Sequence, residues 1–198
     1  MYWASKGVCR VRTAGGRVRK FNRVPVGALG ALVLLLAVTV TAGNVQASNG
    51  ASFEFFVGFE PDPGVAMANN GDTIALLGIG TFNTISKVAT GGGTFVHKNS
   101  AGDVLAAGTW TAVKLVSFKS YGNQPDVFPP DFEGGRARIS VLLDPGGDGI
   151  GPMIPAALMV LCAIGNVPDN KGDENLLNVL DVINFNKAVS GFNLFIRL

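Results

Sequence analysis

Apolar and polar residues alternate along most of the chain after residue 48, and such alternation is the sequence mark of a β-strand. The clearest example is the segment 136–144, where every second residue is apolar and the first three residues between them are Arg136, Arg138 and Ser140. Its apolar positions are Ala137, Ile139, Val141 and Leu143. This pattern predicts a strand with one face in the core and one face in water.

Shorter apolar runs between clusters of Gly, Pro, Asn and Asp predict further strands. They cover residues 52–59, 73–82, 94–98, 104–118, 156–164, 176–185 and 192–198. In the first run, Phe53, Phe55, Val57 and Phe59 are expected to share one face. The run 156–164 is interpreted as a central strand, although its periodicity also fits a short buried helix, and 176–185 fits either a strand or one short helix.

About eight short strands with almost no helix predict a single all-β domain, residues 48–198, built from antiparallel strands. Two architectures are open, a β-barrel and a barrel-like sandwich. We favour the barrel because the first and last segments both alternate strongly. If they paired, two exposed strand edges would disappear.

The N-terminal part of the chain has the order of an export signal. Residues 1–23 carry seven Lys and Arg residues, no acidic residue precedes Glu54, and residues 24–42 are apolar or small. The small residues Val45 and Ala47 then stand where a signal peptidase reads. We therefore predict a signal peptide over residues 1–47, cut after Ala47, and a secreted, extracellular domain. The alternative is a chain anchored in the membrane through residues 24–42.

Removal of the signal peptide changes the charge of the protein. The complete chain has a formal net charge of +2. Residues 48–198 keep nine basic and fourteen acidic residues, a net charge of −5. This acidic domain lacks the basic stripe of a nucleic-acid-binding protein, so no nucleic-acid partner and no stable membrane association after cleavage are expected. Its single cysteine, Cys162, has apolar neighbours and is expected to be a small buried hydrophobe.

Three residues are candidates for ligand binding. His97 is the only histidine and is expected on the face of Phe95, but no second histidine or nucleophile motif accompanies it. Trp110 and Tyr121 lie on or near one long predicted strand and could line an apolar cavity at the mouth of a barrel. The alternative interpretations are that Trp110 fills the core and that His97 is structural. No catalytic residue and no cofactor are predicted.

The loop 144–149 invites a test for calcium, because Asp144 and Asp148 stand four residues apart among glycines. An EF-hand loop needs oxygen ligands at its first, third and fifth positions and a Glu at its twelfth. Here the third position is Gly146 and the twelfth is Pro155. The loop fails this pattern, so no metal site is predicted from the sequence.

The stretch 78–118 resembles small secreted bacterial β proteins that have no assigned function. Its Gly-x-Gly-x-Phe step at 78–82, the Gly-rich segment 91–95 and the triplet 108–110 are also similar to dirigent and allene-oxide-cyclase barrels. That resemblance implies a barrel that holds a hydrophobic small molecule, which the cyclases rearrange without a cofactor. No catalytic residue of those families matches a position in this chain.

Two functions follow from these observations. The first is a secreted β domain without catalytic activity, which binds a partner or has a structural role outside the cell. The second is a barrel that binds or isomerises an apolar small molecule in an internal cavity. The interior decides between them, because dense packing would leave no room for a ligand. The residues expected to fill it are Phe53, Phe55, Trp110, Ile139 and Val141.

Overall fold

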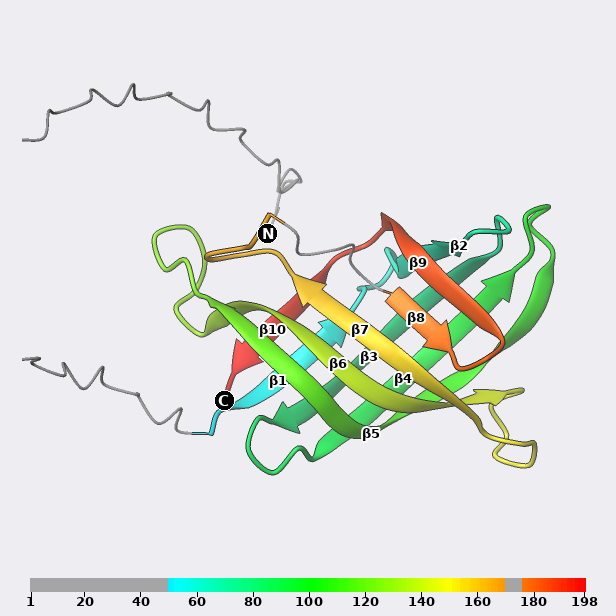
Figure 1. Cartoon of the computed structure of the whole chain (residues 1–198), viewed down its shortest axis with the longest axis horizontal. Helices are drawn as coiled ribbons and strands as arrows, with labels where there is room; N and C mark the ends of the chain where they lie inside the picture. Colours follow the sequence, from blue (N-terminus) through cyan, green and yellow to red (C-terminus); the bar gives the residue numbers. More distant parts are fainter. Residues whose placement is uncertain (1–49, 170–175) are drawn as a thin grey trace, which may run out of the picture. The chain divides into compact units, whose positions relative to one another are not determined.

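The computed structural model describes residues 50–169 and 176–198, so the predicted signal peptide lies outside the described residues. Within the described residues, all regular structure is β (Figure 1). The strands are β1 (Ser52–Val57), β2 (Gly64–Ala68), β3 (Thr73–Asn83), β4 (Ala89–Lys98), β5 (Val104–Gly122), β6 (Phe132–Pro145), β7 (Ile154–Cys162), β8 (Leu176–Val179), β9 (Ile183–Ser190) and β10 (Asn193–Arg197). The prediction of an all-β domain is confirmed.

The ten strands form one antiparallel sheet whose pairings close into a ring. From β3 to β9, each strand pairs with the next one along the chain. Strand β6 pairs in addition with β10. Strand β9 then pairs with β2, and β2 pairs with β3, which closes the ring. Strands β1 and β10 pair with each other, and β1 also pairs with the second half of β3. A ring of this kind leaves few exposed strand edges.

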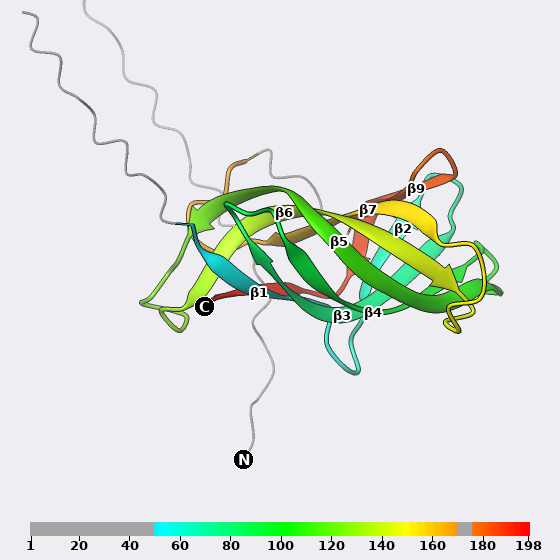
Figure 2. The same ribbon diagram turned by 90° about the horizontal axis from the view of Figure 1, so that it is seen from below.

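The structure has two more strands than the sequence predicted, because β2 has no predicted counterpart and the predicted segment 176–185 contributes to both β8 and β9. The segment 52–68 is divided into β1 and β2 by a loop that begins at Gly58, where φ is 62°. Strands β9 and β10 are separated at Gly191, where φ is 92°, in agreement with a separate predicted segment at 192–198. The loop that joins β1 to β2 projects from the sheet (Figure 2). Residues 176–185, which fitted a strand or a helix, belong to β8, a turn and β9.

Aromatic side chains fill the inner face of the ring. Phe53 lies with its ring centroid 4.8 Å from that of Phe118, and Phe82 lies 5.0 Å from Phe118. Phe195 packs edge-on against both Phe82 and Phe118. These rings belong to one continuous cluster of buried residues, to which Phe118 adds a partly buried side chain. The core is therefore built by strands from both ends of the domain.

The predicted inward and outward faces of 136–144 are confirmed in β6. Ala137, Ile139, Val141 and Leu143 are buried, whereas Arg138 is exposed. Side chains approach the backbone of β3 closely at its glycines. A Cβ atom on Gly78 would collide with the indole of Trp110, and one on Gly80 would meet the ring of Phe55 at 2.7 Å. Aromatic rings therefore pack directly on the backbone of β3, where no side chain intervenes.

Candidate functional site

His97 has a partner that the sequence did not reveal. Its Nε2 atom lies 3.2 Å from Oδ2 of Asp72, the residue that immediately precedes β3. The two side chains meet because β3 and β4 pair in register, with Ile74 opposite His97. They are 19% and 13% exposed. Only the register of the hairpin brings these two residues together, since 25 positions separate them in the chain.

The side chains around His97 indicate a structural role for the pair of His97 and Asp72. The imidazole packs edge-on against Phe185 of β9, with the ring centroids 5.2 Å apart. Phe95, on the same face of β4, is buried in the core. Asp72 therefore gives a polar partner to a histidine that packs against Phe185, and it fixes the orientation of the ring. This geometry fits a structural histidine at the edge of the hydrophobic core.

Trp110 lies in the middle of β5 and is 2% exposed. Its Nε1 atom donates a hydrogen bond to the carbonyl oxygen of Leu77, 3.0 Å away. Phe55 stacks on it at a centroid distance of 6.4 Å. The indole thus has both a polar partner and an aromatic neighbour inside the core, as a buried tryptophan requires.

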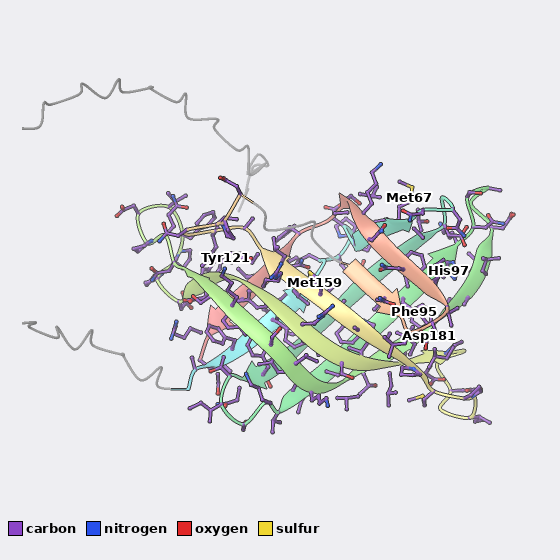
Figure 3. The ribbon with its side chains drawn as sticks, viewed as in Figure 1. Met67, Phe95, His97, Tyr121, Met159 and Asp181 are labelled. Atoms are coloured by element: carbon purple, nitrogen blue, oxygen red, sulfur yellow. The ribbon has the colours of Figure 1, made fainter. Side chains whose placement is uncertain are left out.

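Tyr121 lies at the far end of β5 and is 4% exposed. Its hydroxyl group has no hydrogen-bond partner among the described residues. His97 and Tyr121 lie at opposite ends of the sheet, as Figure 3 shows. The three predicted ligand-binding residues therefore do not converge on one pocket, and their role in binding stays a prediction.

A second polar group closes the opposite end of the ring. Glu133 of β6 is 4% exposed and accepts hydrogen bonds from Oγ of Ser120 and Nη2 of Arg197. The Arg197 guanidinium also lies 5.1 Å above the centre of the Phe53 ring. Sequence reasoning missed this group because its members come from three strands. A polar group therefore lies at each end of the aromatic core. At one end it is the pair His97 and Asp72, and at the other it is Glu133 with its two donors.

The outer surface carries an aromatic patch that the sequence did not predict. We define this aromatic patch as Phe56, Phe59, Ile79, Phe192 and Leu194. Phe56 lies on the outer face of β1, opposite Ile79 of β3 and Leu194 of β10. The rings of Phe56 and Phe59 stack 5.3 Å apart, and those of Phe59 and Phe192 stack 4.4 Å apart. Phe192 is 53% exposed and Ile79 is 46% exposed.

Phe59 was expected on the same face as Phe53, and that prediction is wrong. Strand β1 ends at Val57, and the left-handed conformation of Gly58 turns the chain outward. The N–H of Gly58 then donates to the carbonyl oxygen of Phe192 at 3.1 Å. The N–H of Phe59 donates to the carbonyl oxygen of Asp62 at 3.0 Å, which holds the base of the loop together. Backbone hydrogen bonds therefore fix the stacked rings on the outside.

Acidic residues without basic ones accompany the aromatic patch along β1, β2 and β3. Residues 52–83 contain four acidic residues and no lysine or arginine. Glu60 and Asp62 are exposed on the loop beside Phe59, and Glu54 lies two residues before Phe56 on the same outer face of β1. A group that contacts the aromatic patch therefore meets apolar rings bordered by negative charge.

No protein-family model matches the chain, and no curated protein and no solved structure is significantly similar to it. Within residues 50–169 and 176–198, no helix has the length and apolar character needed to cross a membrane. In the same residues, no group of three or more His, Cys, Asp or Glu side chains is arranged to hold a metal ion.

Proposed function

We propose that the chain is exported and that residues 48–198 form a β-barrel domain that acts by binding, without catalysis, through the aromatic patch on its outer surface. One contrast carries the proposal. The inner face of the ring is filled by packed side chains, whereas three stacked phenylalanines lie outside. Of these rings, Phe192 is 53% exposed, and exposed aromatic groups are typical of interaction sites.

The dense packing of the inner face supports binding at the outer surface. The five residues expected to fill a solid interior are each 2% exposed or less, and all belong to one core cluster. They are Phe53, Phe55, Trp110, Ile139 and Val141. A ligand cavity of several hundred Å³ would need some of these side chains to stand apart.

The pairing pattern supports a barrel of eight strands. In this interpretation β1 with β2, and β9 with β10, each act as one strand with a short interruption. Every strand then pairs with its neighbour along the chain, and the last pairs with the first. Closure removes the two edges that an open sheet would expose in a secreted protein.

The partner of the aromatic patch is, in our proposal, an extended segment of another protein that carries alternating apolar and basic side chains. Lysine or arginine can stack on the exposed face of Phe192 while Glu60 and Asp62 neutralise their charge. A second copy of the domain would bring like charges together, because residues 48–198 have a net charge of −5. Anionic membranes and nucleic acids are disfavoured by the same repulsion.

Binding of defined peptides tests this proposal. An eight-residue fluorescein-labelled peptide of alternating Leu and Lys is expected to bind in fluorescence anisotropy, whereas the same peptide with Glu in place of Lys is not. Phe192→Ser should weaken binding by roughly tenfold, the effect of losing one good aromatic contact. Val189→Ser is the matched control, because Val189 is 52% exposed on β9 and lies outside the aromatic patch. Equal binding to wild type and Phe192→Ser would overturn the proposal.

The alternative function, an internal cavity for an apolar small molecule, is tested on protein from its own culture medium. Native mass spectrometry of the secreted form should give the bare mass of a chain that begins at Ser48. A reproducible additional mass that disappears on denaturation would favour the cavity. Full-length protein in the membrane fraction would overturn the predicted cleavage after Ala47.

A further inference from the structure

Asp144 is a buried carboxylate that is only half satisfied. It lies near the end of β6 and is 4% exposed. Its Oδ2 atom accepts a hydrogen bond from the N–H of Gly149 at 2.8 Å. Its Oδ1 atom is buried and has no hydrogen-bond partner among the described residues. An oxygen in this position is shielded from bulk solvent and receives no donor from the described residues, which is costly for a charged group.

The loop that covers Asp144 has few donors left to offer. The N–H groups of Gly146 and Gly147 donate to the carbonyl oxygens of Ala107 and Asp144. The N–H of Ile150 donates to the Asp148 side chain. The sequence has no lysine or arginine between Arg138 and Lys171, so this stretch brings no positive side chain to Asp144. Oδ1 is thus a negatively charged oxygen that can accept a cation.

A second carboxylate lies in the same loop. Oδ1 of Asp148 is 3.8 Å from the position that a Cβ atom on Gly146 would take, so this side chain folds back over the loop. The two carboxylates together attract a cation that prefers oxygen ligands. Calcium is such a cation, and its flexible coordination by carboxylates, backbone carbonyls and water suits an irregular loop.

We propose that the loop 144–149 binds a calcium ion, with Oδ1 of Asp144 and the carboxylate of Asp148 as its acidic ligands. The site differs from an EF-hand, whose third and twelfth positions are Gly146 and Pro155 here. Two carboxylates give a weak site, in the range of about 10⁻⁴–10⁻³ M that is typical of extracellular modules. The proposal is independent of the aromatic patch, because it rests on a different loop.

Thermal unfolding of the purified protein with calcium chloride, against EGTA at equal ionic strength, tests the site. At about ten times the dissociation constant, calcium should raise the Tm by roughly 3–6 °C. Asp144→Asn and Asp148→Asn should each abolish that shift. Because Asp148 is exposed, Asp148→Asn is expected to fold even if Asp144→Asn does not.

The matched control is Asp103→Asn, which removes an exposed acid from a different loop. Asp103 lies in the turn before β5, where it accepts a hydrogen bond from the side chain of Asn99. This variant should keep the full calcium shift. A wild type whose Tm does not respond to calcium would overturn the proposal, as would an unchanged shift in Asp148→Asn. Loss of the shift in Asp103→Asn as well would mean diffuse charge screening and would also overturn it.

Discussion

Arg197 donates a hydrogen bond from Nη2 to Oε2 of Glu133 at 3.0 Å, which ties the last strand of the chain to the start of β6. The backbones meet at the same place, where Phe195 pairs with Glu133. The Glu133 side chain is 6% exposed, whereas that of Arg197 is 50% exposed. The pair therefore lies at the boundary between the aromatic core and water, and it secures the short contact by which β10 joins β6.

Arg197→Ala is expected to lower the free energy of unfolding by about 1–2 kcal/mol. The buried carboxylate of Glu133 would lose a charged donor, and Phe53 would lose the guanidinium above its ring. Urea denaturation followed by circular dichroism measures the change. Arg138→Ala is the control, since Arg138 is an exposed residue of β6 on the opposite face. If both variants lose the same stability, the contact with Glu133 has no special role.

Gly78→Ala is expected to destabilise the fold by about 1–3 kcal/mol, the usual cost of overpacking a core. The added methyl group would meet the indole of Trp110 and the carbonyl oxygen of Gly92, so the strand or the ring must move. Gly151→Ala serves as the control, because its nearest neighbour would be 3.9 Å away. The same denaturation measurement applies, and equal stability of the two variants would contradict the packing of Trp110 on β3.

Local patterns predicted the faces of β6 well, because alternation within one strand depends only on which side faces the core. The same patterns failed at Phe59, and the reason is the conformation of the residue that precedes it. A sequence pattern cannot show that Gly58 takes a left-handed conformation, and that single turn moves the ring from the inner face to the aromatic patch. The turn at Asp181, where φ is 60°, escaped prediction in the same way, and it divides the predicted segment 176–185 between β8 and β9.

The polar pairs were beyond a sequence pattern for a different reason. His97 and Asp72 are 25 residues apart, and Arg197 and Glu133 are 64 residues apart. Each pair exists only because the registers of neighbouring strands align, and register depends on the packing of the complete sheet. The burial of Asp144 likewise follows from the way its loop folds back, which the failed EF-hand pattern could not reveal.

His97→Ala is expected to leave binding of the Leu-Lys peptide within twofold of wild type. His97 lies at an end of the core with Asp72 and Phe185, away from the aromatic patch, so its loss should affect stability by about 1 kcal/mol. Fluorescence anisotropy and urea denaturation of the same variant separate the two effects. A large loss of peptide binding in a folded His97→Ala protein would place the binding site near His97 and not at the aromatic patch.

Trp110→Phe tests whether Trp110 is a core residue or a ligand contact. The smaller ring would leave a cavity beside Phe55 and remove the hydrogen bond to the carbonyl oxygen of Leu77, at a cost of about 2–3 kcal/mol. Urea denaturation should show this loss in protein refolded without any ligand. Val113→Ala is the control, because Val113 is 48% exposed on the same strand. If Trp110→Phe instead matched wild type in stability, the indole would be standing free beside a cavity, and the internal ligand site would become the better explanation.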